Sequence, residues 1–420
     1  MRILLVSHKY PPHSMGGVEV YTRNLAYALR DQHEVAVLYR HDDRRGLPFA
    51  EIDRNVDGIL MRRISLNPRG LQASVPAEFL RTFQNRRIER SFSRFAAQFQ
   101  PDLIHIQHVM ALSAGILDAA RRSGARVVLT LHDYWFICGN SQLIWPSGQV
   151  CLGKAWGMNC VQCAAAARLP SPIVRWLRLP LAPMFQYRDR IVRRAALQAD
   201  LFISPSRFLA EQYKASGFAP GRFRQLENGI PVGQIQQFGW RPSSSRLRVS
   251  FLGSLAWQKG VHVLIDAFNR LPEGLAKLRI WGDPAVFPNY AHRLKQMLTH
   301  PDANLMGSVA NERVGEVLAD SDLIVVPSLW YENSPVVIQE ARAAGIPVVA
   351  SGHGALAEKV RHEVDGLLFA PGSADALYQV LRRLIEEPDL LAHLRQNILP
   401  PVDIEEHVRH LEDIYRALMA

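Results

Sequence analysis

Two carboxylates, Glu332 and Glu340, lie eight residues apart, just after the apolar run Leu323–Val326. An apolar run, a short polar loop and a second apolar stretch at helical spacing predict a buried strand, a loop and a helix. Ser334 has the side chain of a good N-cap, and Pro335 suits the first position of the helix. The sequence therefore places one carboxylate beside the start of a helix and the other about two turns inside it.

The start of this predicted helix has the properties of an anion-binding site. The first N–H groups of a helix have no partner within it, and the helix dipole favours negative charge there. The backbone around Asn333, Ser334 and Val336 would face such an anion, with Glu332 and Glu340 on either side to bind hydroxyl groups. A ligand that combines phosphates with sugar hydroxyls, a nucleotide-sugar, fits this arrangement.

The same segment resembles the Glu-x7-Glu region of the retaining glycosyltransferase family 4. Three further segments resemble other parts of that family, in the same order along the chain: residues 10–19, 251–260 and 366–369. The resemblance implies an α/β structure of the GT-B type, in which two doubly wound, Rossmann-like domains with parallel sheets face a central cleft. It also implies transfer of a sugar from a nucleotide-sugar donor to an acceptor, with retention of the donor's anomeric configuration.

Two glycine-containing loops carry further donor-site residues in the family. Gly16 and Gly17 match its Gly-Gly loop, which forms part of the wall between donor and acceptor. Gly253, Ser254 and Lys259 match its Gly-Arg-x-x-x-x-Lys-Gly segment, in which the lysine neutralises the diphosphate leaving group. Ser254 departs from the pattern, because a hydroxyl replaces the positive charge of the usual arginine.

The resemblance assigns catalytic roles to three residues, Glu332, His132 and Lys259. Glu332 would orient sugar hydroxyls and stabilise positive charge in a front-face displacement, and His132 would contact the transferred sugar. Glu340 would hold the ribose, while Ser334 and Val336 would offer amides to sugar or phosphate oxygens. Catalysis then needs no metal and no cofactor, because positioning and charge stabilisation supply it.

Short apolar runs alternate with helical patterns along the chain, which is typical of parallel sheets covered by helices on both faces. The predicted strands are 3–7, 34–38, 103–106, 127–131 and 201–204 in the first half, and 248–252, 278–281, 323–326 and 347–350 in the second. A stretch rich in glycine and proline at 228–248 separates the two sets. We predict an acceptor-binding domain of residues 1–230 and 403–420, closed by a helix at 404–419, and a nucleotide-sugar-binding domain of residues 231–402.

The charge distribution favours an anionic partner, since the net charge of the 420 residues is +10. Arginines are interleaved with Trp, Phe, Leu and other apolar residues from Arg168 to Arg194, and with Phe and Ile from Arg81 to Arg94. This mixture is typical of a surface that binds anionic lipid, and the alternative is an ordinary half-buried helix with a basic outer face. No nucleic-acid-binding module is recognisable. The opening residues lack a signal peptide, so we predict a cytoplasmic protein that lies peripherally on the inner face of the cell membrane.

All four cysteines lie in one segment at 138–163: Cys138, Cys151, Cys160 and Cys163. The Cys-x-x-Cys pair with two further cysteines fits a structural Cys₄ zinc site, and free thiols and disulfides remain the alternatives. A cytoplasmic setting disfavours disulfides. The sequence therefore predicts that a structural zinc orders an insert of the first domain.

Taken together, the residues and the resemblance predict a glycosyltransferase that acts on a glycan or a polyprenyl-diphosphate-linked acceptor in the assembly of surface polysaccharide or glycolipid. Two alternatives share the fold. A nucleotide-sugar epimerase would consume the donor without an acceptor, and a catalytically inactive subunit would bind without turnover. The intact Glu332, Glu340 and Lys259 favour the active transferase.

Overall fold

The computed structural model describes residues 1–43, 46–67, 75–151, 153–166, 171–239, 241 and 246–420. The chain forms two compact units. Unit 1 comprises residues 1–146, 151–229 and 404–420, and unit 2 comprises residues 147–150 and 230–403. Arg168, at the start of the first basic stretch, lies outside the described residues.

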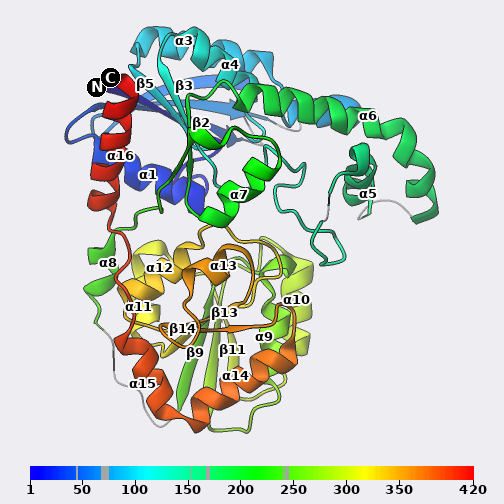
Figure 1. The fold of residues 1–420 in the computed structure, drawn as a ribbon, viewed down its shortest axis with the longest axis vertical. Coiled ribbons are helices and arrows are strands. Elements are labelled where there is room, and N and C mark those ends of the chain that lie inside the picture. Colours follow the sequence, from blue (N-terminus) through cyan, green and yellow to red (C-terminus); the bar gives the residue numbers. More distant parts are fainter. Residues whose placement is uncertain (44–45, 68–74, 152, 167–170, 240, 242–245) are drawn as a thin grey trace. The chain divides into compact units, whose positions relative to one another are not determined.

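Unit 1 is built on a sheet with the strand order β3-β4-β2-β1-β5-β6-β7-β8 (Figure 1). All neighbours pair in parallel except β3 and β4, which are antiparallel. The strands are β1 (Arg2–Ser7), β2 (Glu34–Asp42), β3 (Phe49–Val56), β4 (Ile59–Leu66), β5 (Leu103–Ile106), β6 (Arg126–Thr130), β7 (Leu201–Ser204) and β8 (Phe223–Gln225). The central strands are buried along their whole length, which explains their continuous apolar sequences.

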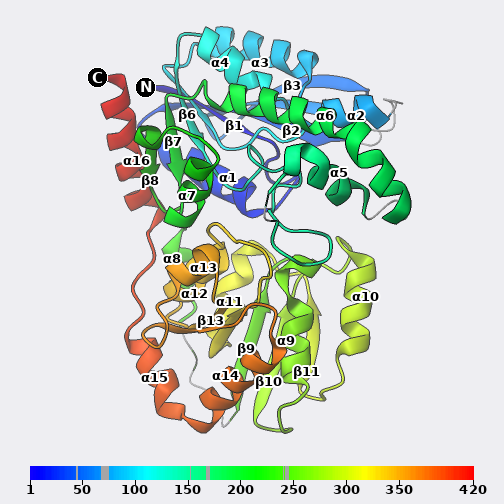
Figure 2. The same cartoon turned by 45° about the vertical axis from the view of Figure 1, so that its right-hand side comes forward.

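Helices cover the sheet of unit 1 on both faces (Figures 1 and 2). They are α1 (Gly17–Leu29), α2 (Val75–Arg81), α3 (Arg86–Phe99), α4 (Gly115–Arg122), α5 (Met158–Ala165), α6 (Ser171–Ala196), α7 (Arg207–Ala215) and α16 (Ile404–Met419). The last helix, α16, packs against α1 and adds Val408, Leu411 and Tyr415 to the core of this unit. The predicted helix at 404–419 is therefore confirmed with its bounds.

Unit 2 contains a fully parallel sheet with the strand order β11-β10-β9-β12-β13-β14. Its strands are β9 (Leu247–Leu252), β10 (Ala276–Trp281), β11 (Ala303–Gly307), β12 (Leu323–Val326), β13 (Val348–Ser351) and β14 (Gly366–Phe369). Its helices are α8 (Val232–Gln236), α9 (Val261–Phe268), α10 (Pro288–Met297), α11 (Val314–Ala319), α12 (Val336–Ala343), α13 (Gly354–Lys359), α14 (Ala374–Glu386) and α15 (Pro388–Gln396). Two apolar clusters pack against this sheet, and β12 contributes Leu323 and Val325 to one and Ile324 and Val326 to the other.

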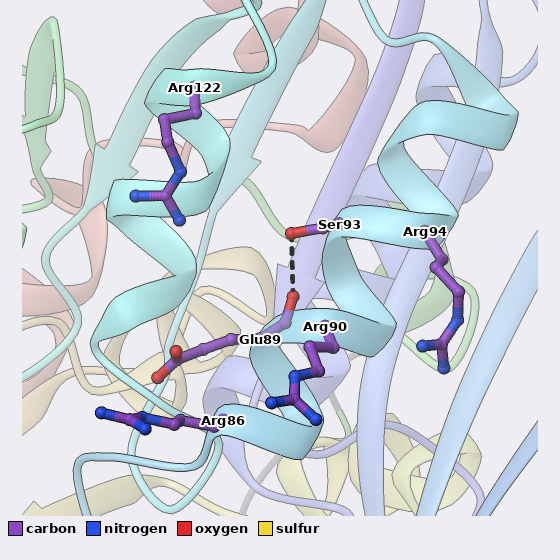
Figure 3. A pocket seen from close by; sticks show the side chains of 6 residues that line it. All are labelled: Arg86, Glu89, Arg90, Ser93, Arg94 and Arg122. Carbon is purple, nitrogen blue, oxygen red and sulfur yellow. Dashed lines mark hydrogen bonds between the residues drawn. The ribbon is translucent and has the colours of Figure 1, made fainter.

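The basic stretch from Arg81 to Arg94 does not have the apolar surface that the sequence predicted. Ile88, Phe92 and Phe95 of α3 are fully buried, so this helix directs its apolar face into the core. The outer face is mainly basic and polar, and Figure 3 shows Arg86, Arg90, Arg94 and Arg122, with Glu89 and Ser93, around a shallow pocket between α3 and α4. The alternative reading, a half-buried helix with a basic outer face, is correct for α3.

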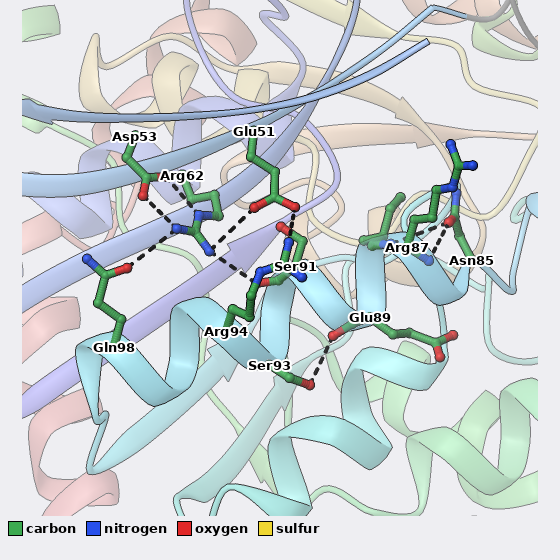
Figure 4. Close-up of polar contacts among 11 residues, drawn as sticks. Glu51, Asp53, Arg62, Asn85, Arg87, Glu89, Ser91, Ser93, Arg94 and Gln98 are labelled. Carbon is green, nitrogen blue, oxygen red and sulfur yellow. Dashed lines mark hydrogen bonds and ion pairs between the residues drawn. The ribbon is translucent and has the colours of Figure 1, made fainter.

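Part of the charge on α3 is neutralised within unit 1. Arg94 forms an ion pair with Glu51 of β3, and Arg62 of β4 pairs with Asp53 (Figure 4). The Asn85 side chain caps α3 by accepting the backbone N–H of Arg87 at 3.1 Å. These contacts show that α3 is a structural element with a cationic exterior. Separately, no helix among the described residues has the length and apolarity needed to cross a membrane.

Candidate functional site

Glu332 lies in the loop between β12 and α12, where it accepts three hydrogen bonds on one oxygen. Its Oε1 accepts from Lys259 Nζ at 2.6 Å, from Ser328 Oγ at 2.7 Å and from Trp330 Nε1 at 2.8 Å. The residue is 4% exposed. Charge-assisted hydrogen bonds of this kind are short and strong, and together they hold the carboxylate in one position. The structure therefore brings together Lys259 and Glu332, which are 73 residues apart in the sequence.

A glycine explains how the two loops can approach so closely. Gly260 follows Lys259, has a φ of +69°, and a Cβ at this position would lie 1.9 Å from the carbonyl oxygen of Pro327. The backbone N–H of Leu329 also donates to the Gln258 carbonyl at 2.8 Å. No side chain larger than hydrogen fits at Gly260, so this residue lets the loop after β12 pack directly against the turn that carries Lys259.

Helix α12 begins one residue later than predicted. Pro335 is the N-cap rather than the first helical residue, because its φ of −64° is helical but its ψ of 117° is extended. Ser334 consequently does not cap the helix, and its buried hydroxyl has no hydrogen-bond partner among the described residues. An unsatisfied buried hydroxyl beside the N–H groups of a helix start can donate to the oxygens of an anionic ligand. Asn333 is buried in the same loop.

Glu340 lies on α12 and is half-buried. Burial raises the pKa of its carboxyl to about 7, because the charged form loses hydration. Such a group suits a ligand whose hydroxyls can donate hydrogen bonds to the carboxylate and favour its ionised form.

The raised pKa of Glu340 predicts a pH-dependent stability. The folded protein binds a proton at Glu340 up to about pH 7, whereas the unfolded chain loses it near the ordinary glutamate pKa of 4.5. The stability that this proton contributes is fully present below pH 4.5 and is lost as the pH rises through 7. Between pH 5 and pH 8, the free energy of unfolding should fall further in the wild type than in Glu340→Gln. The difference between the two falls should be about 1 kcal/mol or more. Urea unfolding of both proteins at several pH values measures the difference, and parallel pH profiles would contradict it.

Gly253 and Ser254 follow β9 and are exposed. Gly253 has a φ of +154°, and its N–H donates to the Trp281 carbonyl at 3.1 Å. The Ser254 carbonyl accepts from the N–H of Ala256 at 2.8 Å, which makes a tight turn before Lys259. This loop supplies backbone groups and a hydroxyl but no positive charge, so Lys259 is the cation of the predicted set in unit 2.

In unit 1, the predicted glycine loop forms the start of α1. Gly16 is the N-cap and Gly17 the first helical residue. A Cβ on Gly16 would lie 2.3 Å from the Glu19 carboxylate, which is buried and accepts a hydrogen bond from Ser14 Oγ at 2.9 Å. Glu19 is the last residue of the segment 10–19 that resembles the family, and its burial in the structure marks it as a residue of this loop.

His132 follows β6 in unit 1 and is held by Gln107. Its Nε2–H donates to Gln107 Oε1 at 2.8 Å, which leaves Nδ1 as the acceptor of the ring. Its ring lies edge-on to Tyr21 of α1, with 5.3 Å between centroids. Burial, with a smaller contribution from His108, lowers the pKa of His132 to about 3. The imidazole is therefore neutral at physiological pH and can exchange hydrogen bonds with a hydroxyl but cannot supply a positive charge.

The four cysteines are free thiols. Burial raises the pKa of Cys160 to about 12 and that of Cys163 to about 11, so both thiols carry protons at neutral pH. Asn140 lies between two of them, accepting from Cys138 and donating to Cys163 Sγ at 3.3 Å. Within the described ranges no three His, Cys, Asp or Glu side chains are placed to hold a metal ion. The zinc site of the four cysteines therefore stays a prediction.

Two family models match the chain and together cover most of it. The model described as Glycosyltransferase Family 4 matches residues 15–234, and the model described as Glycosyl transferases group 1 matches residues 235–399. Among curated proteins, an "Uncharacterized 42.6 kDa protein in cps region" of Klebsiella pneumoniae is 22% identical over 86% of this chain and 88% of its own length. The amylovoran biosynthesis glycosyltransferase AmsK of Erwinia amylovora is 32% identical over 33% of this chain and 36% of its own.

Solved structures share the fold over nearly the entire length. Sucrose-phosphate synthase from Thermosynechococcus elongatus superposes with a TM-score of 0.73 at 20% identity, covering 99% of this chain and 98% of that one. Anabaena Alr3699/HepE in complex with UDP and glucose superposes with a TM-score of 0.69 at 19% identity, covering 99% of each chain. These likenesses confirm the predicted GT-B fold.

Proposed function

The chain belongs to glycosyltransferase family 4, and on that premise we propose that it is a retaining enzyme that transfers a sugar from a nucleotide-sugar to a glycan or lipid-linked acceptor. Relatives such as AmsK act in polysaccharide biosynthesis, which favours surface polysaccharide or glycolipid as the product. Unit 2 would bind the donor and unit 1 the acceptor. The observation that carries the proposal is the part-buried ion pair between Lys259, just before α9, and Glu332, in the loop before α12.

We assign the donor diphosphate to the start of α12 and to Lys259. The N–H groups of Val336 and Val337, the orphan Ser334 hydroxyl and the Lys259 ammonium are the groups that a diphosphate needs. Preorganised donors of this kind stabilise charge that develops on a leaving group. They supply the positive charge that the diphosphate requires, so the proposed mechanism uses no metal ion. UDP is found with Alr3699/HepE, and we extend this class of donor, though not the base, to the present chain.

Glu332 is proposed to orient the transferred sugar and to stabilise the positive charge at its anomeric carbon. Its Oε1 already accepts three hydrogen bonds, which suits a fixed charge better than an attacking nucleophile. Retention would then follow from front-face displacement, with the departing diphosphate accepting the proton of the acceptor hydroxyl. Glu340 would bind the ribose, and the family resemblance assigns His132 to the sugar.

Nucleotide binding tests the donor site directly. We expect one of UDP, GDP, ADP, dTDP and CMP to raise the melting temperature of the wild type, because a ligand that binds only the folded state stabilises it by mass action. Lys259→Ala should lose this shift, whereas Lys295→Ala, which removes an exposed lysine from α10 in the same unit, should keep it. No shift with any nucleotide would overturn the proposed donor site, and consumption of the matching nucleotide-sugar to an isomer without acceptor would indicate an epimerase.

A further inference from the structure

Helix α6 has an exposed apolar face that the core of unit 1 does not use. Trp176 is 86% exposed and Leu179 is 75% exposed, and Ile173 is 48% exposed on the preceding turn. These residues follow one another at intervals of three, so they lie on one side of the helix. Helix α6 contains Pro180 and Pro183, and part of it projects beyond the sheet with α5 beside it (Figures 1 and 2).

The opposite side of α6 packs against the rest of unit 1, so the exposed apolar face belongs to a helix that is held in place. Val174 and Ala182 are buried, and α5 packs against α6. Gly157, just before α5, approaches so closely that a Cβ would lie 2.7 Å from the Ala182 carbonyl oxygen. The loop held by this contact carries Trp156, which is 83% exposed. Two tryptophans and two aliphatic side chains are thus displayed on a supported element, and soluble monomers rarely display such a group without a partner.

The charge of α6 indicates what this partner is. Arg175, Arg190 and Arg194 are exposed along the helix. Asp189 is the one acidic residue of the helix, and it is neutralised by Lys154 at 2.7 Å and Arg188 at 3.1 Å. A helix with exposed Trp and Leu, outward arginines and no unpaired acid matches a monotopic helix on anionic lipid. A second copy of the chain fits poorly, because a symmetric contact would oppose arginine to arginine.

The neighbouring helices add positive charge to the same unit. Helix α4 packs against both α3 and α6. Arg86, Arg90 and Arg122 line the pocket between α3 and α4, and no carboxylate of the described residues forms an ion pair with them (Figure 3). Clustered arginines raise the attraction of a surface toward anionic headgroups within a Debye length.

We propose that unit 1 docks on an anionic phospholipid surface through α6, with Trp176, Leu179 and Ile173 entering the headgroup region. The arginines of the helix contact the phosphates. This inference rests on the proposed function. A transferase that acts on a lipid-linked acceptor needs a surface that binds the membrane, and α6 would provide it.

Sedimentation with vesicles tests the docking surface. The wild type should sediment with mixed phosphatidylglycerol and phosphatidylcholine vesicles, more weakly at high salt, and poorly with phosphatidylcholine alone. The double variant Trp176→Ser/Leu179→Ser should have a vesicle partition coefficient at least about tenfold lower than the wild type, because it loses most of the apolar area that enters the lipid. The matched control Val286→Ser/Phe287→Ser removes two exposed apolar side chains from unit 2 and should bind as the wild type does.

Several outcomes would overturn the inference. They are absence of wild-type sedimentation, equal binding of the α6 variant, and a change of oligomeric state in that variant, which would make the face a protein interface. The nucleotide-induced rise in melting temperature, measured on the same proteins, separates the two proposals. A variant that keeps the nucleotide shift but leaves the vesicles has lost docking alone, whereas a wild type that binds vesicles but no nucleotide contradicts only the donor site.

Discussion

Gly260→Ala is expected to destabilise unit 2 by about 3 kcal/mol or more and to remove nucleotide binding. Two effects combine at this position. The φ of +69° is unfavourable for any residue with a Cβ, and the added methyl would lie 1.9 Å from the Pro327 carbonyl oxygen. Because the clash is with backbone, the loop before Glu332 or the turn carrying Lys259 must move. Either movement separates the lysine from the carboxylate.

A matched glycine separates these two effects. Gly345 has nearly the same φ, +67°, but nothing lies within 4 Å of its Cβ position. Gly345→Ala should therefore cost only the backbone strain, about 1–2 kcal/mol, and should keep nucleotide binding. Urea denaturation gives the stabilities, and the nucleotide thermal shift gives the binding. Equal effects of the two substitutions would show that the close approach at Gly260 does not matter.

Glu332→Gln is expected to lower the rate of sugar transfer by about 10²–10³-fold while the protein stays folded. The amide oxygen can still accept from Ser328 and Trp330, so the side chain keeps its place, but the negative charge is lost. If this charge stabilises the anomeric carbon in the transition state, the loss falls on kcat more than on the nucleotide affinity.

The test of Glu332 needs a control that removes a carboxylate elsewhere in unit 2. Glu316 forms an exposed ion pair with Arg313 at 2.9 Å, so Glu316→Gln should leave transfer unchanged. Initial rates at saturating and limiting donor, with the acceptor held constant, separate kcat from KM. Transfer by Glu332→Gln at the wild-type rate would remove this residue from the catalytic set.

The sequence predicted best those strands whose amino-acid composition is determined mainly by one factor, burial. The runs that became β1, β5, β7 and β12 are buried on both faces, and burial on both faces leaves a continuous apolar signature. Strand β3 was missed because it is an antiparallel strand at the sheet edge with no fully buried residue, so half of its sequence is polar and no continuous apolar run marks it. Strand β11 was missed because buried and exposed residues alternate over only five positions.

The sequence named the residues of the candidate site, whose roles stay predictions, but not the contacts between them. Lys259 and Glu332 were each recognised, yet nothing in their local sequence shows that β9 and β12 are neighbours in the sheet and bring them together. The error at Pro335 has a local cause, since the proline fixes φ but not ψ. The error at α3 arose because a helix with Phe and Ile between arginines has the same sequence pattern whether its apolar face contacts lipid or the protein core. Only the packing of the folded chain distinguishes the two cases.

The return of α16 to unit 1 has a consequence for how the chain is made. His105 of β5 is hydrogen-bonded to Tyr415, and Tyr21 of α1 is hydrogen-bonded to His407 at 2.7 Å. The buried partners of these early residues are therefore synthesised last. During translation, the first unit leaves the ribosome with an apolar surface and two polar groups uncovered, and it stays so until the whole of residues 230–403 has followed. The nascent unit 1 is thus exposed to aggregation and proteolysis until α16 emerges, and a chain that stops before residue 404 lacks the helix that covers this surface.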